Sequence, residues 1–145
     1  MITGLDYLSS MFDVFHDGGL IFVAQDGADL VMQVEILYLA ERVHPDYSLF
    51  NVRLQGVRNL SSRNLNNEEV LTDLPAIFAD EFEILSANVV GDGLEVLCVK
   101  GFGDSLMLSF RIESAVVTDE GGKDYSIEDL VELSNGYWEE FRKGR

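Results

Sequence analysis

The sequence predicts an α+β fold that is mainly antiparallel β-sheet. Apolar and polar side chains alternate with a period of two over most of the chain from residue 19 to residue 118, a pattern typical of strands. Asp-Gly pairs stand between several of these stretches and favour tight hairpins, because glycine readily adopts positive φ. Helical spacing of apolar residues is confined to segments that frame the strands. We therefore expect two related meanders of three to four strands, forming a sandwich or a partly open barrel, with peripheral helices that include a C-terminal helix.

The first half of the chain begins with a predicted helix and continues as a meander. Apolar residues recur every three or four positions over 5–15, which predicts the helix. The segment "GGLIFVAQDGADLVMQVEI" then predicts two strands joined at Asp26-Gly27, the second of them extending over 30–38. A third strand is expected over 50–55, after the loop "VHPDY".

The second half repeats this order of elements. Apolar spacing over 70–78 predicts a helix, which Pro75 should end or kink because proline has no backbone N–H to donate. Alternation predicts two strands in "FEILSANVVGDGLEVLCVK", again around an Asp-Gly pair, and a third over 106–112. The glycine-rich segment "TDEGGKD" predicts a further reversal of the chain.

The two strand-rich halves are related in sequence pattern. The hairpin segments align at a common offset of 64 residues, so that Leu20 corresponds to Ile84. In each half a third strand then leads into another short apolar piece. We interpret 1–145 as a single domain with an internal duplication of about 16–60 and 80–118.

The C-terminal helix has a clear predicted start. Ser126 is a favoured N-cap, because its hydroxyl can accept a hydrogen bond from a free backbone N–H of the first turn. Glu128 and Asp129 follow in that turn, where the helix dipole favours acidic side chains. Gly136 should weaken or interrupt the helix.

The charge of the chain favours a basic partner. The 145 residues include 26 acidic and 10 basic side chains, which gives a formal net charge of −16. Nucleic acids and anionic membrane surfaces would repel such a chain, so we expect neither as a partner. The single cysteine, Cys98, forms no disulfide within the chain, which is typical of the reducing cytoplasm. No secretory signal is expected, since no Lys or Arg precedes Arg42.

A run of acidic residues supplies most of the candidate partner-binding side chains. No basic residue lies between Arg63 and Lys100, so the carboxylates of this interval are not neutralised by sequence neighbours. The motif "NGYWEEFRKG" adds a tyrosine that could be exposed, and aromatic residues are common in binding hot spots. The candidate partner-binding residues are Glu68, Glu69, Asp73, Asp80, Glu81 and Tyr137. Trp138 and Phe141 are expected to anchor the last helix on the core.

The motif His16-Asp17-Gly18-Gly19 gives the alternative site. A His-Asp pair occurs in metal-dependent phosphohydrolases, but that chemistry needs further ligands and the chain has one other histidine, His44. The competing interpretation is structural: Asp17 binds nearby backbone N–H groups and the glycines shape the entry to a strand. If a small-ligand or hydrolase pocket exists, we expect His16, Asp17 and Tyr47 to form it. No catalytic residue, metal ligand or cofactor is expected, because nucleophile elbows and phosphate-binding loops are absent and Cys98 lies in an apolar strand.

The order of motifs resembles that of small acidic, β-rich bacterial proteins. A short helix precedes "FHDGGLIF", strands with Asp-Gly hairpins follow, and "YSIEDLVELSNGYWEEF" ends the pattern. Proteins of this kind are found as uncharacterised families or as immunity proteins of polymorphic toxin systems. The resemblance implies a non-enzymatic module that binds a basic protein partner. The other hypotheses are a small-ligand-binding protein or hydrolase, and a protein that self-associates.

Overall fold

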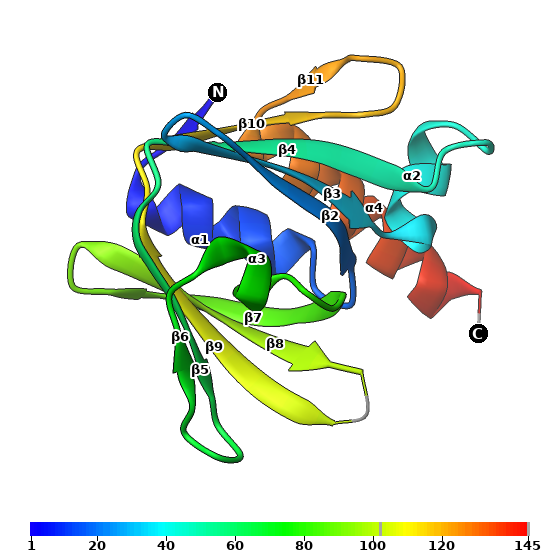
Figure 1. The fold of residues 1–145 in the computed structure, drawn as a ribbon. Helices are drawn as coiled ribbons and strands as arrows, with labels where there is room; N and C mark the ends of the chain where they lie inside the picture. The colour runs from blue at the N-terminus through cyan, green and yellow to red at the C-terminus, as the bar shows by residue number, and fades with distance from the viewer. Residues whose placement is uncertain (102, 145) are drawn as a thin grey trace.

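The computed structural model describes residues 1–101 and 103–144 and has four helices and eleven strands in that part of the chain (Figure 1). The α+β class and the mainly antiparallel sheet are as the sequence predicts. The helices are α1 (Leu5–Val14), α2 (Leu37–Val43), α3 (Leu74–Ile77) and α4 (Ile127–Lys143). The strands are β1 (Ile2–Thr3), β2 (Gly19–Asp26), β3 (Asp29–Glu35), β4 (Leu49–Gln55), β5 (Arg58–Asn64), β6 (Val70–Leu71), β7 (Phe82–Val90), β8 (Gly93–Lys100), β9 (Asp104–Arg111), β10 (Ser114–Thr118) and β11 (Asp124–Tyr125).

All strands belong to one sheet that is not closed. The strand order is β1-β10-β4-β3-β2-β7-β8-β9-β5-β6, with β11 added to β10. The sheet folds over between β2 and β7, which pair only at Gly19 with Glu83 and at Leu20 with Phe82. Figure 1 shows the resulting two layers, with β2, β3, β4 and β10 above, β7, β8, β9 and β5 below, and α1 between them. The helix fills the space that two diverging strands leave open.

The two meanders carry the same irregularity at the predicted offset. β2 shifts its register against β3 between Leu20 and Phe22. β7 shifts against β8 between Ile84 and Ser86, which lie 64 residues later in the chain. A bulge adds one residue to one strand and bends it, so both strands turn away from their shared contact in the same way.

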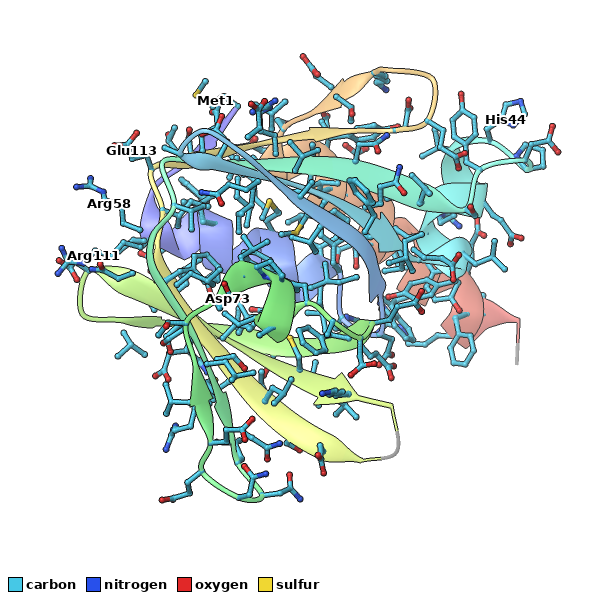
Figure 2. The ribbon with its side chains drawn as sticks, in the orientation of Figure 1. Met1, His44, Arg58, Asp73, Arg111 and Glu113 are labelled. Carbon is cyan, nitrogen blue, oxygen red and sulfur yellow. The ribbon has the colours of Figure 1, made fainter. Side chains whose placement is uncertain are left out.

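Each meander gives its fourth strand to the other layer. β4 runs on into β5, which crosses to pair with β9, and β9 runs on into β10, which crosses back to pair with β4. Gln55 therefore faces Ser114, and Arg111 faces Arg58. Figure 2 shows Arg58, Arg111 and Glu113 together at this crossing, on the left edge of the molecule. This exchange supports the internal duplication of about 16–60 and 80–118, which stays a prediction.

The core lies between the layers and around α1. Leu8, Met11 and Phe15 of the α1 segment are fully buried, as are Phe50 of β4 and Ile84 of β7. The Cys98 thiol of β8 is also fully buried, and burial raises its pKa to about 12. A thiol in this state is not a nucleophile at neutral pH, which agrees with the prediction that Cys98 is a core residue.

Two predicted boundaries differ from the structure. The strand expected over 30–38 ends at Glu35, and Tyr38 lies in α2, a helix that the alternation did not reveal. The helix expected over 70–78 is shorter, because Val70 and Leu71 form β6. Pro75 stands in the first turn of α3 rather than ending it, and a missing N–H costs nothing at that position.

The C-terminal helix begins where the sequence predicts. Ser126 is the N-cap and forms a capping box, in which its hydroxyl accepts from Asp129 N at 3.1 Å and its own N–H donates to Asp129 Oδ2 at 3.1 Å. The helix continues through Gly136 without interruption. Packing against α1 and α2 compensates for the low helix propensity of that glycine.

Candidate functional site

The His16-Asp17-Gly18 segment joins the two layers of the sheet. Asp17 N donates to Ile84 O at 2.7 Å, and Ile84 N donates to Gly18 O at 2.8 Å. A Cβ at Gly18 would lie 2.8 Å from both Phe15 O and Val34 Cγ1, so only glycine fits. The segment thus continues the pairing of β2 with β7 beyond the ends of those strands.

His16 is fixed by three neighbours. Its Nδ1 is 2.9 Å from Asp13 O, a distance at which the ring nitrogen donates a hydrogen bond. Its ring stacks on Trp138 at 5.7 Å between centroids, and its Nε2 is 3.8 Å from Asp17 Oδ2. Asp13 Oδ1 in turn accepts from Ala87 N at 3.0 Å. These contacts give His16 and Asp17 structural partners, and no observation favours the small-ligand hypothesis, which stays a prediction.

An aromatic cluster holds α4 against α2 and the end of α1. We define it as His16, Tyr38, Tyr137, Trp138 and Phe141. The Tyr38 ring lies 4.5 Å from that of Tyr137 and 6.0 Å from that of Trp138, and Trp138 lies 5.6 Å from Phe141. Tyr38 Oη donates to His16 O at 3.0 Å. Burial, together with the charge of Asp17 and the neighbouring Tyr137, raises the pKa of Tyr38 to about 12, so its hydroxyl remains a donor at neutral pH.

The structure therefore places Tyr137 in this cluster rather than among the acidic residues of the predicted run. Tyr47 belongs to neither group. It stacks on His44 at 4.7 Å, and His44 lies at the outer edge of the molecule (Figure 2). Within residues 1–101 and 103–144, no contact joins Tyr47 to His16 or Asp17.

Several acidic residues gather at one end of the lower layer. Asp80 and Glu81, in the turn before β7, line a cavity of about 500 Å³ together with Lys100, Gly101 and Asp104 of the β8–β9 hairpin. Lys100 Nζ lies 2.9 Å from Asp80 Oδ2. Glu81 makes no ion pair with any residue in the described parts of the chain.

The β5–β6 turn brings two further carboxylates to the same end. Leu65 N donates to Ser105 O at 2.8 Å, and Ser105 N donates to Asn66 Oδ1 at 2.9 Å. Asn64 Nδ2 also donates to Asp104 Oδ2 at 3.3 Å. The turn between these anchors carries exposed Glu68 and Glu69. We call this surface the acidic end, and it comprises Glu68, Glu69, Asp80, Glu81 and Asp104.

Sequence reasoning missed one member of the acidic end and included a residue with a different role. Asp104 follows Lys100, outside the basic-free interval, and only the β8–β9 hairpin returns it to Asp80. Asp73 caps α3, since its Oδ2 accepts from Ala76 N at 3.1 Å. Figure 2 places Asp73 beside α3, well above the β5–β6 turn at the bottom of Figure 1.

Intramolecular ion pairs already use half of the basic residues. Arg53 contacts both Asp26 and Asp29, at 2.7 and 2.8 Å. The other pairs are Arg42 with Glu140, Arg58 with Glu113, Lys100 with Asp80 and Arg111 with Asp92. Five of the 10 basic residues thus neutralise acidic neighbours, which leaves most of the 26 carboxylates without a cation.

One buried carboxylate lies outside the acidic end. Asp119, only 5% exposed, accepts from Gly121 N at 2.9 Å, Lys123 N at 3.0 Å and Tyr125 Oη at 2.9 Å. Burial alone would raise the pKa of this carboxyl, but the hydrogen bonds from Lys123 N, Tyr125 Oη and Gly121 N outweigh burial and lower it. Asp119 is therefore an ionised acceptor that shapes the β10–β11 turn.

No side-chain set in the described residues has the composition of a metal site. Among residues 1–101 and 103–144, three or more His, Cys, Asp or Glu side chains nowhere converge closely enough to hold an ion. No helix in the same residues has the length and apolar character that crossing a membrane requires. Comparisons with models of protein families, with curated proteins and with solved structures find no match to this chain.

Proposed function

We propose that this protein is a non-catalytic module that binds a basic protein through its acidic end, in the manner of an immunity protein masking a basic toxin surface. The observation that supports this proposal best is the gathering of Glu68, Glu69, Asp80, Glu81 and Asp104 from three separate turns, with Lys100 as their one ion-pair partner among the described residues. Carboxylates this close raise the local negative potential and attract a complementary surface.

The acidic end would act mainly on the rate of association. Exposed carboxylates steer a basic partner toward the correct surface from a distance of about one Debye length, roughly 8 Å at physiological salt. Their contribution to affinity is smaller, because exposed ion pairs are screened by water and ions. The proposal also assigns the protein to the bacterial cytoplasm, where a chain with one buried thiol and no disulfide is stable.

Charge reversal at the acidic end tests the proposal. A candidate partner is first captured from a lysate of the native host at low salt and eluted at high salt. The variant Glu68→Lys, Glu69→Lys, Glu81→Lys should then slow association with the purified partner at least about tenfold at low salt and flatten the salt dependence of the rate. Stopped-flow or surface plasmon resonance measurements give both quantities. Asp73 is left intact because it caps α3.

A matched variant distinguishes local steering from net charge. Glu35→Lys, Glu41→Lys, Asp124→Lys changes the charge by the same amount at exposed positions elsewhere. The proposal requires this control to slow association much less than the acidic-end variant does. Equal effects of the two variants, or a captured partner that is itself acidic, would contradict it.

A further inference from the structure

A second surface, made by different elements, has the properties of a protein-binding groove. A cavity of about 630 Å³ lies between α1 and α4, which pack side by side (Figure 1). Its floor is apolar: Tyr7 of α1 is 57% exposed, Val131 of α4 is 37% exposed, and Ile127 lies between the helices. Large apolar side chains this exposed lose water favourably when a partner covers them.

Three carboxylates of α4 line the same groove. Glu128, Glu132 and Glu139 follow one another at spacings of four and seven residues, which places them along one side of the helix. None of them makes an ion pair with any residue of 1–101 or 103–144, whereas the neighbouring Glu140 pairs with Arg42 at 2.7 Å. The groove is therefore apolar inside and negatively charged along one edge.

The length of the groove fits a helix. The residues that line it on α4 run from Ile127 to Glu139, which at 1.5 Å per residue is a distance of about 18 Å. A helix of about 12 residues has the same length and would place apolar side chains from successive turns on the floor. Lys or Arg residues flanking that apolar stripe would meet Glu128, Glu132 and Glu139.

We propose that the α1–α4 groove binds an amphipathic, basic helix of a protein partner. A second copy of this chain fits poorly, because two chains that each carry a net charge of −16 repel one another. This inference goes beyond the proposed function: the groove shares no residue with the acidic end and would bind a helix whether or not the acidic end steers a partner.

A designed peptide tests the groove directly. The probe is a 14-residue peptide in which leucines at helical spacing form one face and lysines the other. At low salt it should bind the full-length protein, with chemical-shift changes in ¹H–¹⁵N spectra centred on Tyr7, Val131 and Asn135. A peptide of the same composition with the helical spacing scrambled, and an amphipathic Leu/Gln peptide, should each bind at least about tenfold more weakly, because one lacks the apolar face and the other the charge.

Matched variants separate the groove from the acidic end. Glu128→Gln, Glu132→Gln, Glu139→Gln should weaken the Leu/Lys peptide about tenfold or more, and Val131→Ser should weaken it with the charge unchanged. Glu68→Gln, Glu69→Gln, Glu81→Gln removes the same charge from the acidic end and should change binding no more than about twofold. Thermal unfolding of each variant verifies that it is folded.

Three results would overturn the groove proposal. Equal binding of the scrambled peptide would show attraction by charge alone. Shift changes centred on the β5–β6 turn, or loss of binding only in the acidic-end variant, would move the site to the acidic end and leave the proposed function intact. Equal binding of the Leu/Gln peptide would identify an apolar partner without basic character.

Discussion

At the scale of single residues, the position of Asp17 explains the His16-Asp17-Gly18 motif better than catalysis does. Asp17 adopts a φ of 67°, a left-handed conformation that is strained for most residues other than glycine. This backbone geometry lets its N–H reach Ile84 O on the other layer. The residue therefore acts through its backbone, at the point where the two layers are joined.

The stability of Asp17 variants should follow this backbone role. Asp17→Gly should keep or slightly raise the free energy of unfolding, because glycine adopts positive φ without strain. Asp17→Ala should lower it by about 1 kcal/mol, since alanine keeps the Cβ and loses the local hydrogen bonding that aspartate uses in this conformation. Urea unfolding followed by Trp138 fluorescence measures both. If Asp17→Gly is the more damaged variant, the carboxylate itself is essential and the pocket hypothesis gains support.

The sequence predicted some roles of residues and could not predict others. Cys98 and Ser126 were recognised because their roles depend on local pattern, namely alternation in a strand and spacing in a first helical turn. The contacts of His16 with Trp138, and of Asp104 with Asn64, join residues that are distant along the chain. No local signal encodes such contacts, so the aromatic cluster and the full acidic end emerge only from the fold.

At the scale of elements, the helices show how local and tertiary signals compete. α4 begins at its predicted cap because Ser126 and Asp129 satisfy each other's backbone N–H groups. α2 was missed because the alternation of 30–38 continues past the point where Ile36 ends the strand. Its apolar residues pack on β4 and α4, and tertiary packing decides the conformation of so short a helix.

Removing the cap should destabilise α4 measurably. Ser126→Ala deletes the hydroxyl that accepts from Asp129 N and should lower the free energy of unfolding by about 1 kcal/mol. The matched control is Glu128→Ala, which removes an exposed side chain of the same turn without touching the capping box. Urea titration of the two variants should separate them by more than half of that amount. Equal midpoints would indicate that packing on α1 and α2, not the cap, fixes the start of α4.

The capping box also has a pH signature. Hydrogen bonds from Ser126 hold the pKa of the Asp129 carboxyl below its ordinary value. A carboxyl whose pKa is lower in the folded state stabilises that state above the ordinary pKa, and the contribution is lost as the pH falls toward the folded value. Asp129→Asn should therefore lose less stability than the wild type between neutral pH and pH 3 in the same titration.

At the scale of the whole molecule, uncompensated negative charge opposes the compact state. The chain has a pI of about 4.2, and its basic residues are largely engaged in ion pairs that already stabilise the fold. Repulsion among the remaining carboxylates is stronger in the folded protein than in the extended chain, because folding brings them closer together.

Salt should therefore stabilise the protein at neutral pH. Raising NaCl from 10 to 300 mM at pH 7 should increase Tm by about 4 °C, the shift that about 1 kcal/mol produces in a domain of this size. Near the pI, where the net charge is close to zero, the same change in salt should shift Tm far less. Differential scanning calorimetry measures both series. A fall of Tm with salt at pH 7 would mean that ion pairs outweigh the repulsion.

Composition and alternation predicted the fold class, the hairpins and most strands, but not the topology. The crossings of β5 and β10 depend on pairings between Arg58 and Arg111 and between Gln55 and Ser114, across more than 50 residues of chain. Alternation identifies which side of a strand is buried and is silent about the neighbouring strand. The register of the two bulges agrees with the predicted offset, because repeated sequence produces repeated local geometry.

The exchange of fourth strands also affects how the chain is made. During synthesis, β4 emerges long before β10, and β5 emerges long before β9, so both lack their long-range partner while the second meander is still in the ribosome. The nascent first meander therefore exposes an unpaired strand edge, a surface on which chains aggregate. A ribosome that pauses between residues 64 and 104 prolongs that exposure, and synonymous codons in this interval should alter the yield of soluble protein without changing one amino acid.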